Sequence, residues 1–114
     1  MADNSIKEMT REILAYRTKF AAKYPDIAHG FAVLQKSVMQ DGRLPAKEKE
    51  LVAVGISVGL RCVPCIYAHT RSALKLGATP EEIMEAASVA ILMAGGPGIA
   101  HVVKVLKAID AFTG

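Results

Sequence analysis

Two cysteines, a histidine and a glutamate form the most chemically unusual pattern in this 114-residue chain. Cys62 and Cys65 make a C-x-x-C pair, His69 follows the second cysteine by four residues, and Glu50 precedes the first by twelve. At the start of a helix, unpaired backbone N–H groups and the positive end of the helix dipole favour a thiolate. Such surroundings lower the pKa of a thiol and leave a useful fraction nucleophilic at neutral pH. The pattern therefore predicts thiol chemistry.

The histidine distinguishes the two cysteines. Residues four apart on a helix share a face, so we expect Cys65 and His69 to be stacked neighbours. The imidazole can accept the thiol proton and then stabilise the thiolate as an ion pair. Cys62 lies about one helical turn before Cys65, close enough for an intramolecular disulfide. We predict that Cys65 attacks and Cys62 resolves, the reverse of the thioredoxin-type order, because only Cys65 has a histidine one turn away.

Glu50 would be the third residue of the site, beside Cys65 and His69, if the helices on either side of residues 60–61 form an antiparallel hairpin. At 1.5 Å per residue, Glu50 lies about 15 Å from that turn along one helix and His69 about 12 Å along the other. The two side chains are then roughly level, within reach directly or through one water. A carboxylate that orients a histidine is the usual partner of a nucleophile–base pair.

Start and stop signals upstream of these residues predict two helices. Ser5 followed by Glu8 has the spacing of a capping box, and Pro25 suits the first turn of a second helix. Four large apolar residues of that second helix fall on one face: Ile27, Phe31, Leu34 and Val38. Residues 40–43 read as a turn.

Four more helices are predicted from Pro45 onward. The third starts at Pro45 and ends near Gly59, the fourth runs from residues 62–64 to Gly77, and Thr79 with Pro80 and Glu82 opens the fifth. A sixth follows a break at residues 95–98. Aromatic residues make up 5% of the chain and hydrophobic residues 52%, which suits closely packed helices. The expected fold is all-α: one domain over residues 1–114, a compact bundle of about six helices.

Composition and patterning restrict the partners. Residues 51–60 and 86–94 are apolar nearly all round, and so short a chain has few helices to cover them, which predicts a homo-oligomer. The net charge of +3 comes without a basic stripe, which argues against nucleic acid. No apolar run approaches the ~20 residues of a membrane span, and Lys7 and Glu8 are unlike a secretory signal. We expect a cytoplasmic protein, in whose reducing surroundings a cysteine pair is more often catalytic or metal-binding than structural.

From Glu50 to His69 the sequence resembles the AhpD-like alkylhydroperoxidase branch of the carboxymuconolactone decarboxylase family. The similarity covers roughly residues 20–112, is tightest at 44–70, and includes Gly95-Gly96-Pro97 before the last helix. It implies an all-α fold and trimers or hexamers. The thiol chemistry expected of the cysteines requires no cofactor or metal. The family's roles, carried over, make Cys65 the peroxidatic cysteine, Cys62 the resolving one, and Glu50 with His69 the proton relay. Some relatives have a protonatable or aromatic residue just before the second cysteine; Pro64 cannot supply such a side chain.

The function expected is that of a thiol-dependent peroxidase, with a hydroperoxide as substrate and an external dithiol as reductant. Three alternatives remain open. The same pair could serve general dithiol–disulfide exchange. The four side chains, Cys62, Cys65, His69 and Glu50, could instead bind zinc in a helical module without turnover, although three ligands from two turns of one helix is an uncommon arrangement. The fourth reading is a decarboxylase acting on a lactone, which the C-x-x-C disfavours.

Overall fold

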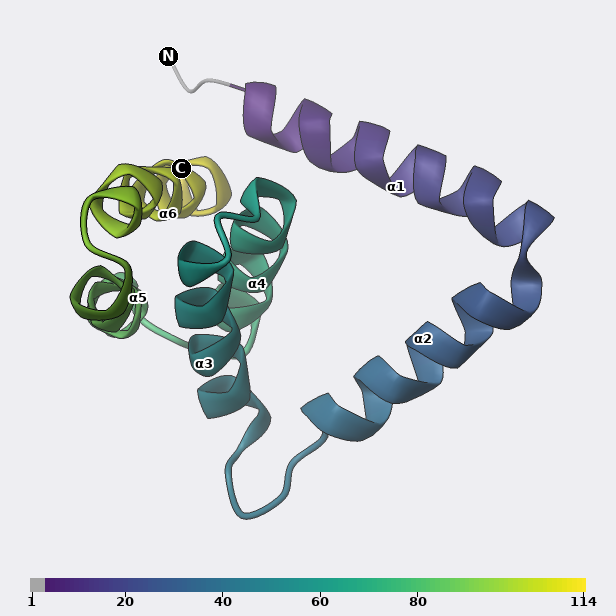
Figure 1. Cartoon of the computed structure of the whole chain (residues 1–114), viewed down its shortest axis with the longest axis horizontal. Coiled ribbons are helices and arrows are strands. Elements are labelled where there is room, and N and C mark those ends of the chain that lie inside the picture. Colours follow the sequence, from purple (N-terminus) through teal and green to yellow (C-terminus); the bar gives the residue numbers. More distant parts are fainter. Residues whose placement is uncertain (1–3) are drawn as a thin grey trace.

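Six α-helices joined by short turns make up the computed structural model, which describes residues 4–114 (Figure 1). They are α1 (Ser5–Lys23), α2 (Pro25–Met39), α3 (Ala46–Gly59), α4 (Val63–Lys75), α5 (Pro80–Ala94) and α6 (Gly96–Thr113). No strand occurs within the described residues, which confirms the predicted all-α fold. The predicted number of helices is confirmed as well. None of the helices between residues 4 and 114 combines the length and the hydropathy that crossing a membrane requires.

Helices α3 to α6, which we call the bundle, contain nearly all of the core. Helix α3 packs against α4 and α5, and α6 packs against the same two helices. The largest fully buried apolar side chains all belong to the bundle: Val54, Val58, Ile66, Ile83 and Val105. Alanines fill much of the rest of this core, which allows the helix axes to approach closely without aromatic side chains between them.

Helices α1 and α2, which we call the arm, bury very little. Figure 1 shows them as a V that stands beside α3 and α4. Among the described residues α1 reaches α4 and α6, with Ile6 buried, whereas α2 approaches only α1 and α3 and buries no residue. The predicted apolar face of α2 exists, but Ile27, Phe31, Leu34 and Val38 are 50–61% exposed because no helix of the described part of the chain packs over them.

Three predicted helix starts were wrong, the first of them by one residue, since α3 begins at Ala46 with Pro45 as its N-cap. Helix α1 begins at Ser5 itself, so its N-cap is Asn4, whose side chain makes no capping hydrogen bond, and the predicted box of Ser5 with Glu8 does not form. The break before α6 is one residue long, because Gly95 alone takes a positive φ and Gly96 already belongs to the helix. The capping box at the start of α5 is confirmed: Thr79 and Glu82 exchange hydrogen bonds with each other's backbone N–H.

Candidate functional site

The connection between α3 and α4 fixes where the first cysteine lies. The N–H of Arg61 donates to Val58 O and the N–H of Cys62 donates to Ser57 O, both at 3.0 Å. These two bonds form a Schellman motif, which ends a helix with one residue in the left-handed region. That residue is usually glycine; here Arg61 adopts it, with φ 57°. The chain therefore leaves α3 and starts α4 within three residues.

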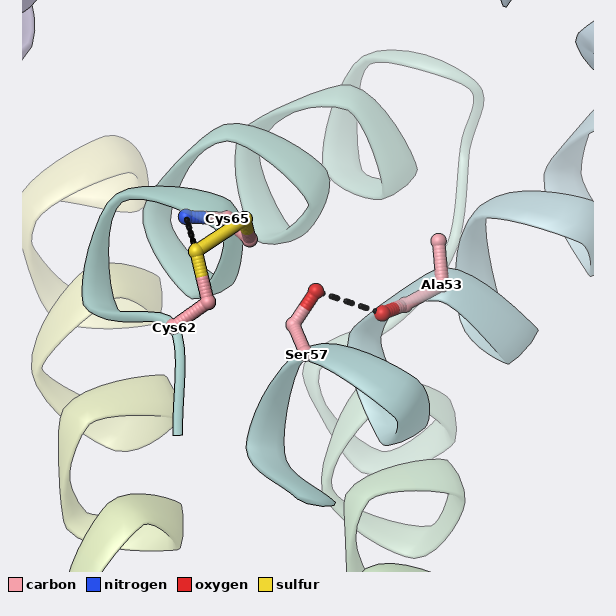
Figure 2. The surroundings of a disulfide bond; sticks show 4 residues. All are labelled: Ala53, Ser57, Cys62 and Cys65. Atoms are coloured by element: carbon pink, nitrogen blue, oxygen red, sulfur yellow. Dashed lines mark hydrogen bonds between the residues drawn. A yellow bond between two sulfur atoms is a disulfide. The ribbon is translucent and has the colours of Figure 1, made fainter. Parts of the chain in front are cut away.

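Cys62 caps the new helix, and Cys65 lies in its first turn. Cys62 has an extended backbone, and its Sγ accepts a hydrogen bond from the N–H of Cys65 at 3.3 Å. Pro64 occupies the first turn, where no intrahelical donor is needed. The two sulfurs form a disulfide across a Cα–Cα distance of 5.2 Å (Figure 2). The predictions that the C-x-x-C opens a helix and that its cysteines can bond to each other are confirmed.

Glu50 and His69 meet between α3 and α4. His69 Nδ1 lies 2.7 Å from Glu50 Oε2, which confirms the predicted antiparallel hairpin and the direct contact between the two side chains. Glu50 is only 7% exposed, so it is not the solvated side chain that the charged residues beside it suggest. When Glu50 is ionised it can only accept a hydrogen bond, so in that form Nδ1 of His69 is the donor, and Nε2 of the neutral ring is left as an acceptor.

The structure therefore brings all four predicted side chains onto two adjacent helices. Glu50 comes from the first part of α3, while Cys62, Cys65 and His69 come from the cap and the first two turns of α4. Cys62, Cys65 and His69 are half-buried, so the disulfide and the histidine both keep contact with solvent. In the part of the chain that the structure describes, no three His, Cys, Asp or Glu side chains are grouped so that they could hold a metal ion. The zinc hypothesis thus gains no support from the geometry.

Sequence reasoning missed Ser57. This residue is 4% exposed, and its carbonyl is the one that accepts from Cys62 N–H. Figure 2 shows its side chain in the surroundings of the disulfide, with the hydroxyl bonded to Ala53 O at 2.6 Å. A signal was available: Ser57 is the only polar side chain in the apolar run 51–60 and follows Glu50 by seven residues, two helical turns.

Tyr67, which could have lined the site, belongs to the core instead. It is 5% exposed and packs in the cluster of buried residues of the bundle. Burial raises the pKa of its phenol above the ordinary value of 10.0, so the ring stays protonated at neutral pH. A packing role accounts for Tyr67.

Solved structures of similar chains share this arrangement of helices. The apo form of a carboxymuconolactone decarboxylase family protein from Legionella pneumophila superimposes with a TM-score of 0.95 at 32% identity, covering 98% of this chain and 100% of its own. A second family protein, from Thermotoga maritima, has a TM-score of 0.80 at 27% identity and covers 90% and 87% of the two chains. The name of the second protein suggests involvement in an antioxidative response.

Sequence comparisons lead to the same group of proteins. The model of the carboxymuconolactone decarboxylase family matches residues 25–108. A protein from Cupriavidus necator, named as uncharacterised, is 40% identical over 87 residues, which are 76% of this chain and 77% of that protein. A protein from Paracoccus denitrificans, named as uncharacterised protein 4 in the cox locus, is 40% identical over 88 residues, 77% and 79% of the two chains.

Proposed function

Since the chain belongs to the carboxymuconolactone decarboxylase family, we propose that it is an AhpD-like, thiol-dependent peroxidase that works through a dithiol–disulfide cycle. The observation that carries the proposal is the 2.7 Å contact between Glu50 and His69 on the same two helices that present the bonded cysteines. A redox-active disulfide, a base and a carboxylate that orients the base are the parts that such a cycle needs. The antioxidative association of the Thermotoga maritima relative supports the same reading.

The first step consumes the hydroperoxide. His69 accepts the thiol proton of Cys65 on Nε2 while Glu50 holds Nδ1–H in place. The thiolate attacks the terminal oxygen of ROOH and the O–O bond breaks. Cys65 becomes a sulfenic acid, and the alkoxide leaves as ROH with the proton returned by His69. The sulfur is oxidised by two electrons and the peroxide is reduced by the same two.

The second step closes the disulfide. The thiol of Cys62 condenses with the Cys65 sulfenic acid, which forms the S–S bond and releases water. An external dithiol then reduces the pair by thiol–disulfide exchange, becomes a disulfide itself and returns both cysteines to thiols. The bonded pair seen between Cys62 and Cys65 corresponds to the state after condensation and before reduction. No flavin, haem or metal enters these steps.

The assignment of roles to the two cysteines is testable because their surroundings differ. Cys62 Sγ already accepts a backbone N–H at the start of α4, whereas Cys65 shares a helix face with His69. We assign attack to Cys65 because the proton must leave the attacking sulfur, and only Cys65 has a base one turn away.

Peroxide consumption with dithiothreitol as reductant tests the proposal. Wild-type protein should turn over a panel of hydroperoxides, and Cys65→Ser and Cys62→Ser should each abolish turnover. A sulfenate-specific reagent should label Cys65 in the Cys62→Ser variant and nothing in Cys65→Ser. Label on Cys62 alone would reverse the assignment, and a wild-type protein inactive with every peroxide would overturn the peroxidase function.

General dithiol–disulfide exchange is the second candidate. It is favoured by the cap position of Cys62, because a sulfur that accepts a backbone N–H at a helix start is a good leaving thiolate. Catalysed reduction of a disulfide substrate, in a protein that leaves peroxides untouched, would select this function. The same Cys62→Ser and Cys65→Ser variants would lose that activity.

We further propose that the working form is a homo-oligomer in which the arm of one copy covers an apolar groove of another. The groove, of about 560 Å³, lies between α3 and α5 and is lined by apolar residues such as Ile56, Leu60, Val89 and Met93. The Legionella pneumophila chain has the same arrangement over 98% of this chain, arm included, although the arm has few contacts within the chain. A second copy would provide the missing contacts for both surfaces.

Size-exclusion chromatography with light scattering tests this assembly. The expected particle is a multiple of 12.1 kDa, with three or six copies as the family resemblance implies. Leu34→Glu on the arm and Met93→Glu in the groove should each lower the mass, whereas Leu76→Glu, outside both surfaces, should leave it unchanged. A wild-type monomer would refute the assembly.

A further inference from the structure

The hydroxyl of Ser57 is buried beside the disulfide but bonded only to its own helix. Ser57 Oγ donates to Ala53 O at 2.6 Å, the carbonyl four residues earlier. In a helix the carbonyl of Ala53 already accepts the backbone N–H of Ser57. The hydroxyl of Ser57 therefore adds a second bond to that carbonyl, which the helix does not need. This bond therefore does not explain why α3 has a polar side chain, only 4% exposed, in an otherwise apolar stretch.

The position of this hydroxyl relative to the cysteines is set by the backbone. Ser57 O accepts the N–H of Cys62, which ties the last part of α3 to the start of α4. In the view of Figure 2 the hydroxyl lies between the Ala53 carbonyl and the sulfur of Cys65. Rotation about the Cα–Cβ bond would release the hydroxyl from the carbonyl and free it for another acceptor in the surroundings of the disulfide.

We propose that Ser57 is a hydrogen-bond donor to the Cys65 thiolate, and that its hydroxyl moves between Ala53 O in the disulfide state and Cys65 Sγ in the reduced state. The inference rests on the proposed function, in which Cys65 passes through a thiolate. It adds a group that touches the reacting sulfur and that is absent from the relay of Glu50 and His69.

The charge on the sulfur decides which acceptor the hydroxyl prefers. A disulfide sulfur is neutral and a weak acceptor, so the carbonyl of Ala53 is the better partner while the bond is closed. A thiolate carries a full negative charge, and hydrogen bonds to ionised groups are roughly twice as strong as neutral ones. Reduction thus changes the preferred acceptor without any movement of α3, whose backbone stays tied to Cys62.

Such a donor would act at two points of the cycle. It would hold a larger fraction of Cys65 as thiolate before attack, in addition to the effect of His69. It would also stabilise Cys65 as the leaving thiolate when an external dithiol attacks Cys62 Sγ, because a more stable leaving thiolate departs faster. Both contributions come from one hydroxyl on the opposite helix.

The test is the pH dependence of Cys65 alkylation, measured in the Cys62→Ser background so that only one thiol reacts. Serine at position 62 keeps an oxygen at the N-cap of α4 as acceptor for the Cys65 N–H. Adding Ser57→Ala should move the apparent pKa of Cys65 up by about one unit, the loss of one hydrogen bond to a charged group. Ser57→Thr, which keeps the hydroxyl, should leave the profile near that of the parent.

Ser88→Ala is the matched control, since Ser88 Oγ makes a similar 2.6 Å bond to the Glu85 carbonyl but is exposed on α5. It should not move the profile. If Ser57→Ala does not fold by circular dichroism, the isosteric pair Ser57→Thr and Ser57→Val gives the same comparison with the buried volume held constant. Profiles that coincide for Thr and Val, or for Ser57→Ala and its parent, overturn the role of Ser57. Peroxide turnover of the wild type, measured alongside, shows separately whether the proposed function holds.

Discussion

The bundle and the arm are built from similar amino acids but differ in what those residues contact. In the bundle, apolar side chains of α3–α6 face one another and are fully buried at positions such as Val58 and Ile83. In the arm, residues of the same kind are more than half exposed, among them Leu14 and Ile27. An amphipathic pattern gives a helix one apolar face, but burial depends on whether a second element reaches that face. The disulfide and the hydrogen-bonded pair of Glu50 and His69 lie in the part where such elements are present.

The largest contrast should come from truncating the same residue type in each region. Ile83→Ala on α5 leaves a cavity at a fully buried site and should lower the free energy of unfolding by about 3 kcal/mol. Ile27→Ala on α2, at a site 61% exposed, should change it by less than about 0.5 kcal/mol in dilute protein. Urea denaturation at several protein concentrations measures both. If a second copy covers the arm, the cost of Ile27→Ala grows with concentration; equal costs in dilute protein would refute the contrast.

Glycine-to-alanine substitutions should change stability in opposite directions in the two regions. A Cβ at Gly98 would lie 2.9 Å from Ala90 O and 3.0 Å from Ile91 Cα, where α6 crosses the backbone of α5. Gly98→Ala should therefore destabilise the protein by about 2 kcal/mol, the usual cost of overpacking. Gly30, within α2, has open space around it, so Gly30→Ala should stabilise by about 0.5–1 kcal/mol through helix propensity. Thermal unfolding followed by circular dichroism gives both signs, and a shift of the same sign in both variants would contradict the prediction.

Helix caps provide a smaller contrast. Thr79 caps α5 through a complete capping box, so Thr79→Ala should cost about 1 kcal/mol. Asn4 caps α1 without a side-chain hydrogen bond, and Asn4→Ala should cost less than about 0.5 kcal/mol. Chemical denaturation of the two variants measures the difference. A larger loss for Asn4→Ala would mean that the start of α1 is held by its side chain after all.

Acid pH should destabilise the bundle slightly, through protonation of Glu82. The pKa of Glu82 is lowered from its ordinary value of 4.5 by the backbone N–H of Thr79 and then by the ammonium of Lys47, 3.1 Å away. Because the folded protein holds this carboxyl ionised more readily than the unfolded chain does, its contribution is complete above pH 4.5 and is lost as the pH falls below that value. Glu82→Gln should flatten this part of the stability profile. A profile that Glu82→Gln does not alter would remove the assignment.

Local sequence signals gave correct predictions where the chain itself supplies every partner that the predicted feature needs. Thr79 with Glu82 forms the box that its spacing predicts, and Cys62 and Cys65 open α4 as expected. The contact of Glu50 with His69 was also foreseeable, because a tight turn near residues 60–61 leaves an antiparallel hairpin as the simplest arrangement. Ser5 with Glu8 has the same spacing as the box of Thr79 with Glu82, yet α1 starts one residue too early for it to form. Spacing alone does not fix the residue at which a helix begins.

The sequence by itself determined the six helices, the cysteine pair at the start of one of them and the level at which Glu50 and His69 meet, since each depends on local geometry of fixed rise and period. Only the tertiary structure decided that α2 buries nothing, that Arg61 takes a left-handed conformation usually left to glycine, and that Ser57 lies beside the disulfide. These features depend on which surfaces meet in space. Contacts between elements distant in sequence are set by packing of the whole chain and leave no periodic trace along it.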